Sequence, residues 1–80
     1  MTDYEVSQIV RNKLIQCRIE SHLTQKEVGE IVDKKPTTVA SWEQGLSLPD
    51  IDTLYRLTKY YGKTLAYMFG EEDGDSKSNK

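Results

Sequence analysis

Short polar side chains are concentrated in the segment PTTVASWEQG, residues 36–45. On a helix, four of them fall on one side: Thr37, Thr38, Ser41 and Gln44. Hydroxyl and amide groups form hydrogen bonds without carrying a charge, and base edges in the DNA major groove offer donors and acceptors to them. Ala40 or a threonine methyl group could contact a thymine methyl group. With Val39 and Trp42 on the inner side, the segment predicts a DNA-recognition helix anchored by Trp42.

Other kinds of chemistry find little support in the sequence. His22 is the only histidine and Cys17 the only cysteine, which argues against a disulfide and against a metal site. No Ser–His–Asp set, Cys–His pair, paired acids, Gly-rich phosphate loop or cofactor motif can be assembled. We therefore expect no enzyme activity, no metal, no cofactor and no small-molecule ligand.

Helical periodicity dominates the first third of the chain. Apolar residues recur at spacings of 4, 4 and 3 at Val6, Val10, Leu14 and Cys17. This pattern predicts an amphipathic helix over 6–21, with Cys17 in the core. Thr24 followed by Glu27 is a capping-box pair, which predicts a second helix over 24–32. Asp33 tolerates left-handed backbone, so a tight turn follows.

Three further helices are expected after this turn. Pro36 suits the first turn of a helix that runs to about residue 44 and stops at Gly45. Asp50 caps a helix over 51–61, whose expected buried face is Ile51, Leu54, Leu57 and Tyr61. Thr64 caps a short fifth helix that buries Leu65, Met68 and Phe69. No strand-like alternation occurs, so the expected fold is all-α, with five short helices around one small core.

The charges divide the chain into two parts. The net charge is −2, and residues 71–80 hold four acids and two bases, which leaves nine of each in residues 1–70. A neutral domain over 1–70 can still present a local basic face, whereas the acidic segment 71–80 lacks periodicity and is expected to be a disordered tail. The sequence contains no membrane-spanning apolar run and no basic-then-apolar start, so we expect a cytoplasmic protein.

The connection between the second and third helices is only three or four residues long, as in a helix-turn-helix. Such a close crossing needs a small residue, and Gly29 is the candidate, although a neutral surface glycine is the alternative. Together, these features resemble the phage repressor and Cro family, also called XRE-type helix-turn-helix proteins, whose lambda-repressor-like fold has five helices. The matching elements are Leu23-Thr24-Gln25, Gly29, Trp42-Glu43-Gln44-Gly45, Pro49 and Leu54/Leu57, within residues 6–69.

The resemblance implies roles for individual residues. Gln25 and Gln44 match positions that contact DNA phosphates, and Thr37, Thr38 and Ser41 match positions that face the groove. Arg18 and Glu43 match a buried or half-buried ion pair between the first and third helices. Two solvated surface charges are the alternative for this pair.

The chain also departs from the family pattern. Asp33 and His22 stand where glycine is usual, and both residue types accept left-handed backbone. Lys34 and Lys35 replace an apolar residue and a Ser or Thr cap, so the third helix is less well capped unless Thr37 or Thr38 takes over. The two lysines either contact phosphate or form a solvated turn. Leu46-Ser47-Leu48 replaces a basic loop, and its leucines either make a dimer contact or pack onto the fourth helix.

Two functions from different classes follow. The first is a sequence-specific double-stranded DNA-binding regulator, a repressor that binds its operator as a homodimer, either of phage or mobile-element type or antitoxin-like. The second is a protein–protein adaptor on the same fold that uses a tyrosine-rich surface on the last two helices. The tyrosines Tyr55, Tyr60, Tyr61 and Tyr67 favour packing or a protein interface over stacking on single-stranded bases.

Overall fold

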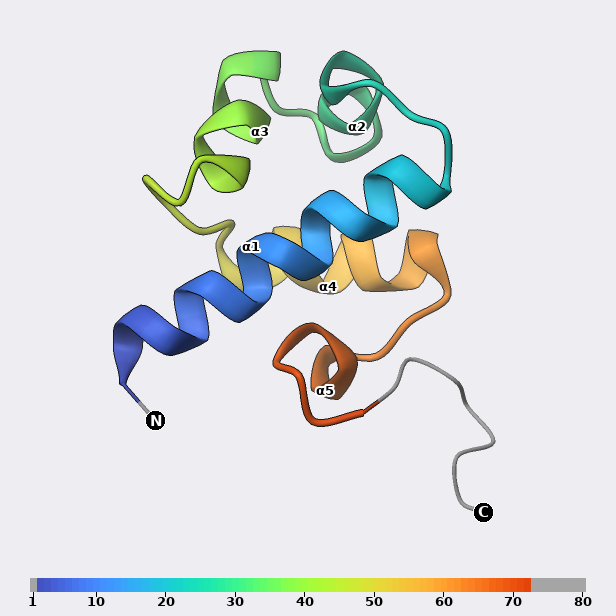
Figure 1. Cartoon of the computed structure of the whole chain (residues 1–80). Coiled ribbons are helices and arrows are strands. Elements are labelled where there is room, and N and C mark those ends of the chain that lie inside the picture. Colours follow the sequence, from blue (N-terminus) through green and yellow to red (C-terminus); the bar gives the residue numbers. More distant parts are fainter. Residues whose placement is uncertain (1, 73–80) are drawn as a thin grey trace.

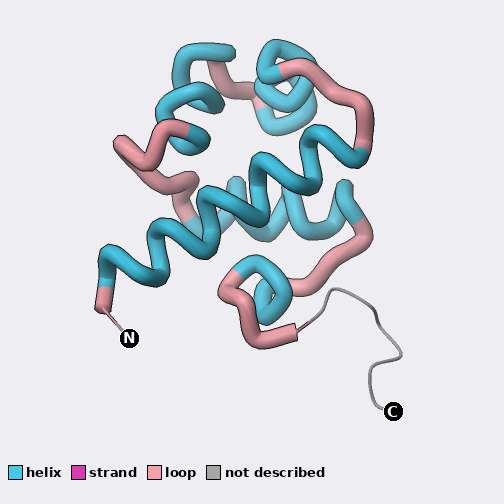
Figure 2. Tube along the Cα trace, viewed as in Figure 1, coloured by secondary structure: helices cyan, strands magenta, loops and turns pink. Residues whose placement is uncertain are grey.

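The computed structural model describes residues 2–72, which form five helices and no strand. The helices are α1 (Asp3–Glu20), α2 (Gln25–Val32), α3 (Pro36–Glu43), α4 (Ile51–Tyr61) and α5 (Leu65–Met68). α1 runs diagonally across the molecule in Figure 1, with α2 and α3 on one side of it, α5 on the other, and α4 passing behind. Short loops connect all five helices (Figure 2). The expected all-α class with five helices is confirmed.

Threonine caps set the start of α1 and α2. The backbone N–H of Glu27 donates to Thr24 Oγ1 over 3.1 Å, and the Thr24 N–H donates to Glu27 Oε1 over 2.8 Å. Thr2 and Glu5 form the same reciprocal pair at 3.1 and 2.7 Å. The prediction that the first helix begins at residue 6 was therefore wrong, because this capping box starts α1 at Asp3.

The core lies between α1 and the other four helices. Its buried apolar residues are Val10, Leu14, Cys17, Val28, Val32, Val39, Trp42, Leu54, Leu57, Tyr67 and Met68. Cys17 is one of them, as its place in the apolar pattern predicted, and burial raises the pKa of its thiol. This buried thiol is thereby kept in its neutral, unreactive form.

The structure overturns one expectation for the last helices and decides another. Ile51 is 61 % exposed, because Thr53 and Thr58 join Leu54 and Leu57 on the buried face of α4 and place Ile51 at its margin. Tyr67 is only 2 % exposed, so of the two alternatives for the tyrosines, packing or a protein interface, it takes packing in the core. Tyr67 Oη lies beside the Cys17 thiol, and the ammonium groups of two lysines cover its ring.

The end of the domain includes the first two residues of the predicted tail. The Glu71 N–H donates to the Ala66 carbonyl over 2.8 Å, and Thr64 Oγ1 donates to Glu72 Oε1 over 2.6 Å. The rest of the predicted tail, residues 73–80, lies outside the described residues. None of the helices within residues 2–72 combines the length and apolar character that crossing a bilayer requires.

Candidate nucleic-acid interface

The turn between α2 and α3 depends on a glycine and an aspartate. Asp33 has φ 61° and ψ 47°, the left-handed conformation that a short polar side chain tolerates. The chain then folds back so that the Lys34 N–H donates to the Gly29 carbonyl over 2.7 Å. A Cβ atom on Gly29 would overlap the Lys34 carbonyl oxygen. Gly29 therefore has a packing role, and it makes room for the backbone of the turn rather than for α3 itself.

The two sides of α3 differ as the residue pattern predicts. Val39 and Trp42 are 1 % and 3 % exposed and pack into the core. The polar and small residues reach the surface: Thr37 and Gln44 are exposed, while Thr38, Ala40 and Ser41 are half-buried. α3 thus presents an uncharged surface of hydroxyl, methyl and amide groups, which suits contact with base edges.

Arg18 of α1 and Glu43 of α3 form a half-buried ion pair. Arg18 Nε donates to Glu43 Oε2 over 2.7 Å and Nη2 donates to Oε1 over 2.9 Å, a bidentate arrangement. The third nitrogen, Nη1, donates to the Leu23 carbonyl over 2.9 Å. The carboxylate raises the pKa of Arg18, chiefly through these hydrogen bonds. The pair ties the end of α3 to α1.

Gln25 joins this pair. Its amide Nε2 donates to Glu43 Oε1 over 3.1 Å, so the first residue of α2 is linked to the last residue of α3. An amide nitrogen carries two hydrogens, and one remains to reach a phosphate. The phosphate contact itself stays a prediction.

Lys34 and Lys35 are both exposed beside the start of α3. Lys35 is the N-cap residue and makes no side-chain capping bond, and neither Thr37 nor Thr38 takes over this function. Pro36 has no N–H, and the Thr38 N–H donates to the Lys35 carbonyl over 3.0 Å, so in the first turn the Thr37 N–H is left to solvent. The two lysines thus place two ammonium groups beside the start of α3, with the Asp33 carboxylate next to them in the chain.

The C-terminal end of α3 closes with two backbone bonds around Gly45. The Gly45 N–H donates to the Trp42 carbonyl over 3.2 Å and the Leu46 N–H donates to the Ser41 carbonyl over 3.0 Å, which is a Schellman motif. Gly45 has φ 79°, a conformation that favours glycine. The Ser41 and Ser47 hydroxyls lie 2.8 Å apart, so the following loop is bonded to the outer face of α3.

Leu46 and Leu48 do not pack onto α4. They are 75 % and 44 % exposed, so the alternative that both leucines are tucked away was wrong. With the exposed Ile51 they form what we call the loop patch: Leu46, Leu48 and Ile51. The three residues lie within six positions of the sequence, directly after α3.

Sequence reasoning missed Arg11. Its Nε donates to the backbone carbonyl of Glu43 over 2.7 Å, so a second arginine of α1 contacts the last residue of α3. Arg11 and Arg18 are seven residues apart, which places them on one face of α1 two turns apart. The spacing of the two arginines is visible in the sequence and could have suggested a shared role. Their acceptors differ, however, and no residue type marks a backbone carbonyl as the acceptor for Arg11.

Two hollows on the surface of residues 2–72 are lined by residues outside α3. One of about 520 Å³ is lined by Tyr4, Glu5, Gln8 and Ile9 of α1. A smaller one, about 210 Å³, is lined by Tyr55, Thr58, Lys59, Lys63, Thr64 and Leu65. Within residues 2–72, no group of three or more His, Cys, Asp or Glu side chains is placed to hold a metal ion.

Comparison with known proteins gives a consistent result. The sequence pattern of the family described as "Helix-turn-helix" matches residues 14–68. Multiprotein-bridging factor 1a of Arabidopsis thaliana is 26 % identical over 65 residues, which are 81 % of this chain and 46 % of that protein. The cryptic phage CTXphi transcriptional repressor RstR of Vibrio cholerae is 27 % identical over 62 residues, 78 % of this chain and 56 % of that protein. The chain thus spans about half the length of these curated relatives, and no solved structure gives a significant match.

Proposed function

Because the chain belongs to the phage repressor and Cro (XRE-type) helix-turn-helix family, we propose that it regulates transcription by binding double-stranded DNA sequence-specifically. In this proposal α3 enters the major groove, where Thr37, Thr38, Ala40 and Ser41 contact base edges. Gln25, Lys34, Lys35 and Gln44 contact the phosphates on either side and set the register. A protein that binds DNA in this way acts in the same compartment as the DNA, and we propose that this compartment is the cytoplasm.

One observation carries the proposal: the exposed side of α3 is polar and uncharged, while its last residue is bonded to α1 and α2. Arg18 and Gln25 both donate to the Glu43 carboxylate, at 2.7 to 3.1 Å. A helix that only covered a core would need no such attachment at its end. A recognition helix needs it, because base readout requires side chains that are held in place before binding.

We further propose that the protein is a repressor that binds its operator as a homodimer. The loop patch supports the dimer, since exposed aliphatic groups beside a recognition helix are suited to contact with a second copy. Two copies would present two α3 helices to half-sites about 34 Å apart, one turn of DNA. Repression is supported by the phage relative, which is a transcriptional repressor.

The decisive experiment is selection of bound duplexes from a random DNA pool, at low salt and at near-physiological salt. We expect an inverted repeat whose half-site centres lie about one helical turn apart. Replacement of Thr37, Ser41 and Gln44 by alanine should then abolish selective binding without loss of stability, because these side chains are exposed or half-buried. Failure to enrich any sequence at either salt concentration would contradict the proposal.

A protein–protein adaptor on the same fold is the second candidate, and two observations favour it. Tyr55 and Tyr60 of α4 are 49 % and 53 % exposed, and one relative is named a multiprotein-bridging factor. For this function Tyr60→Ala should reduce partner binding, whereas alanine at Thr37, Ser41 and Gln44 should change nothing. Tyr67 is not suitable for this test, because its ring is buried in the core.

A further inference from the structure

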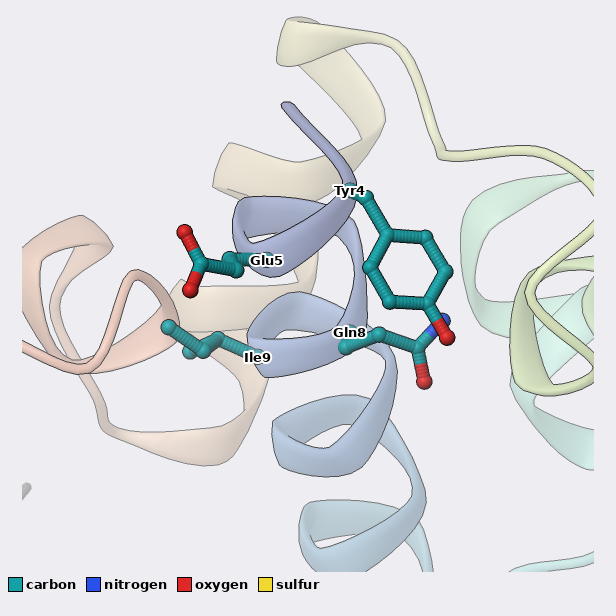
Figure 3. A pocket seen from close by; sticks show the side chains of 4 residues that line it. All are labelled: Tyr4, Glu5, Gln8 and Ile9. Atoms are coloured by element: carbon teal, nitrogen blue, oxygen red, sulfur yellow. The ribbon is translucent and has the colours of Figure 1, made fainter. Parts of the chain in front are cut away.

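The N-terminal half of α1 lies outside the residues that the family pattern matches. The family pattern begins at residue 14, whereas α1 begins at Asp3. In Figure 3, Tyr4 and Gln8 project from one side of this segment, and Glu5 and Ile9 from the other. Gln8 reaches the end of α3, because a Cβ atom on Gly45 would meet its Nε2 at 3.4 Å. Ile9 lies on the opposite side, where a Cβ atom on Gly70 would meet its Cγ2 at 3.0 Å.

Arg11 is the hydrogen-bond donor for the last carbonyl group of α3. The last four carbonyls of a helix lack intrahelical partners. Backbone N–H groups of residues 44–46 satisfy those of Ala40, Ser41 and Trp42. The Glu43 carbonyl is left over, and Arg11 Nε donates to it over 2.7 Å. α3 has no basic residue in its own last turn, so Arg11 also supplies the positive charge that the negative end of the helix favours.

The Arg11 side chain is itself held in place. Its Nη1 donates to Gln8 Oε1 over 3.4 Å and to Asn12 Oδ1 over 3.2 Å, so α1 orients the guanidinium group. The aliphatic part of the same side chain packs under Gly45, where an added Cβ atom would meet Arg11 Cδ at 3.3 Å. Arg11 thus contacts both the last residue of α3 and the residue that turns the chain into the loop patch.

We infer that Arg11 is a positioning residue for DNA recognition, which fixes the end of α3 and residues 44–48 in the orientation that operator binding requires. This inference rests on the proposed function. Arg18 holds the Glu43 side chain, whereas Arg11 holds the Glu43 backbone. Two arginines of α1 thus hold the last residue of α3, one through its side chain and the other through its backbone carbonyl.

The test compares Arg11→Met with Lys59→Met. Methionine retains much of the arginine stem and its packing under Gly45 but has no donor. Lys59 is exposed on α4, so its replacement removes one positive charge away from α3. Affinity is measured by fluorescence anisotropy on the selected operator and on a duplex of unrelated sequence, over a range of salt concentrations. Backbone amide resonances are recorded for both variants without DNA.

We expect Arg11→Met to lower operator affinity about tenfold, since it removes a hydrogen bond from a charged donor. Its affinity for unrelated DNA and its salt dependence should equal those of Lys59→Met, and its largest amide shifts should fall on residues 44–48. Equal operator affinity for the two variants would overturn the inference. A salt slope reduced by about 0.9 on operator and unrelated DNA alike would also overturn it, because it would identify Arg11 as a phosphate contact.

The two proposals fail in different ways. If the unmodified protein selects no duplex, the proposed function fails, and the operator part of this inference fails with it. The amide resonances still decide whether Arg11 holds residues 44–48, and unchanged resonances there in Arg11→Met would overturn that part independently of DNA.

Discussion

Arg18 and Glu43 join α1 to α3 through two parallel hydrogen bonds, 2.7 and 2.9 Å long, although 25 residues separate them in the chain. The two side chains are 19 % and 9 % exposed, so both charges are largely withdrawn from water. Such a pair contributes little net stability compared with apolar residues of the same shape, but it is costly to break on one side only. Its contribution to this protein is therefore the orientation of α3.

Replacing Glu43 with alanine should lower the free energy of unfolding by about 3 kcal/mol, because Arg18 would remain charged and half-buried without its carboxylate partner. The double variant Arg18→Met, Glu43→Leu should recover most of this loss, since neither charge is left alone. Urea unfolding followed by the emission of the buried Trp42 measures both values. A single-variant loss below roughly 0.5 kcal/mol would mean that the pair behaves as an ordinary surface contact.

Gly29→Ala should destabilise the protein by about 2 kcal/mol, although alanine is normally the better helix former by about 1 kcal/mol. The reason is the overlap between the added methyl group and the Lys34 carbonyl oxygen, which is backbone and cannot move aside alone. Glu30→Ala, at the exposed neighbouring position on α2, is the matched control and should change stability by no more than roughly 0.5 kcal/mol. Thermal unfolding of the two variants measures these changes. A midpoint for Gly29→Ala above that of the unmodified protein would contradict the packing role.

Lys34→Ala and Lys35→Ala should each weaken DNA binding by a similar factor on operator and on unrelated sequence. Each should also reduce the slope of log affinity against log salt concentration by about 0.9, because one neutralised phosphate is lost. Titrations at four or more salt concentrations measure the slope. A slope equal to that of the unmodified protein would assign the lysine to a solvated turn, which is the alternative that its exposed position also allows.

Lowering the pH should loosen the start of α4 through Asp50. The Asp50 carboxylate accepts a hydrogen bond from the Thr53 N–H over 3.0 Å, and the bonds to Thr53 lower the pKa of Asp50. Because the pKa of Asp50 is lowered in the folded state, the ionised carboxylate stabilises the fold at pH values above the unfolded-state pKa of about 3.9. This stabilisation is lost as the pH falls through the folded-state pKa. Asparagine also caps helices but does not titrate.

The measurement is therefore the difference in unfolding midpoint between the unmodified protein and Asp50→Asn as the pH is lowered from neutral. The difference should stay constant down to about pH 5 and then shift in favour of the asparagine variant as the pH falls further. A difference that does not change with pH would show that the charge on Asp50 adds nothing to the cap.

Local chemistry decided most of the secondary structure, and the sequence was sufficient for it. Thr24 and Glu27 lie three residues apart and form their capping box without help from any other element. The left-handed turn at Asp33, the proline at the first position of α3 and the glycine after its end likewise depend on neighbouring residues alone. The recognition-helix pattern of Thr37, Ser41, Val39 and Trp42 was readable for the same reason, since helical periodicity sorts residues by face.

Tertiary structure decided which residues meet across helices. The pairing of Arg11 with the Glu43 carbonyl could not be predicted, because a backbone acceptor is present at every residue and only the packing of α1 on α3 selects this one. Ile51 was assigned to the wrong environment, and Tyr67 was left between packing and an interface, because periodicity gives the direction of a side chain but not where the neighbouring helices end. The sequence alone thus determined that there are five helices and which face of α3 is polar, because capping and periodicity are local. The contacts that hold α3 in position came from long-range packing, which depends on the relative placement of whole elements.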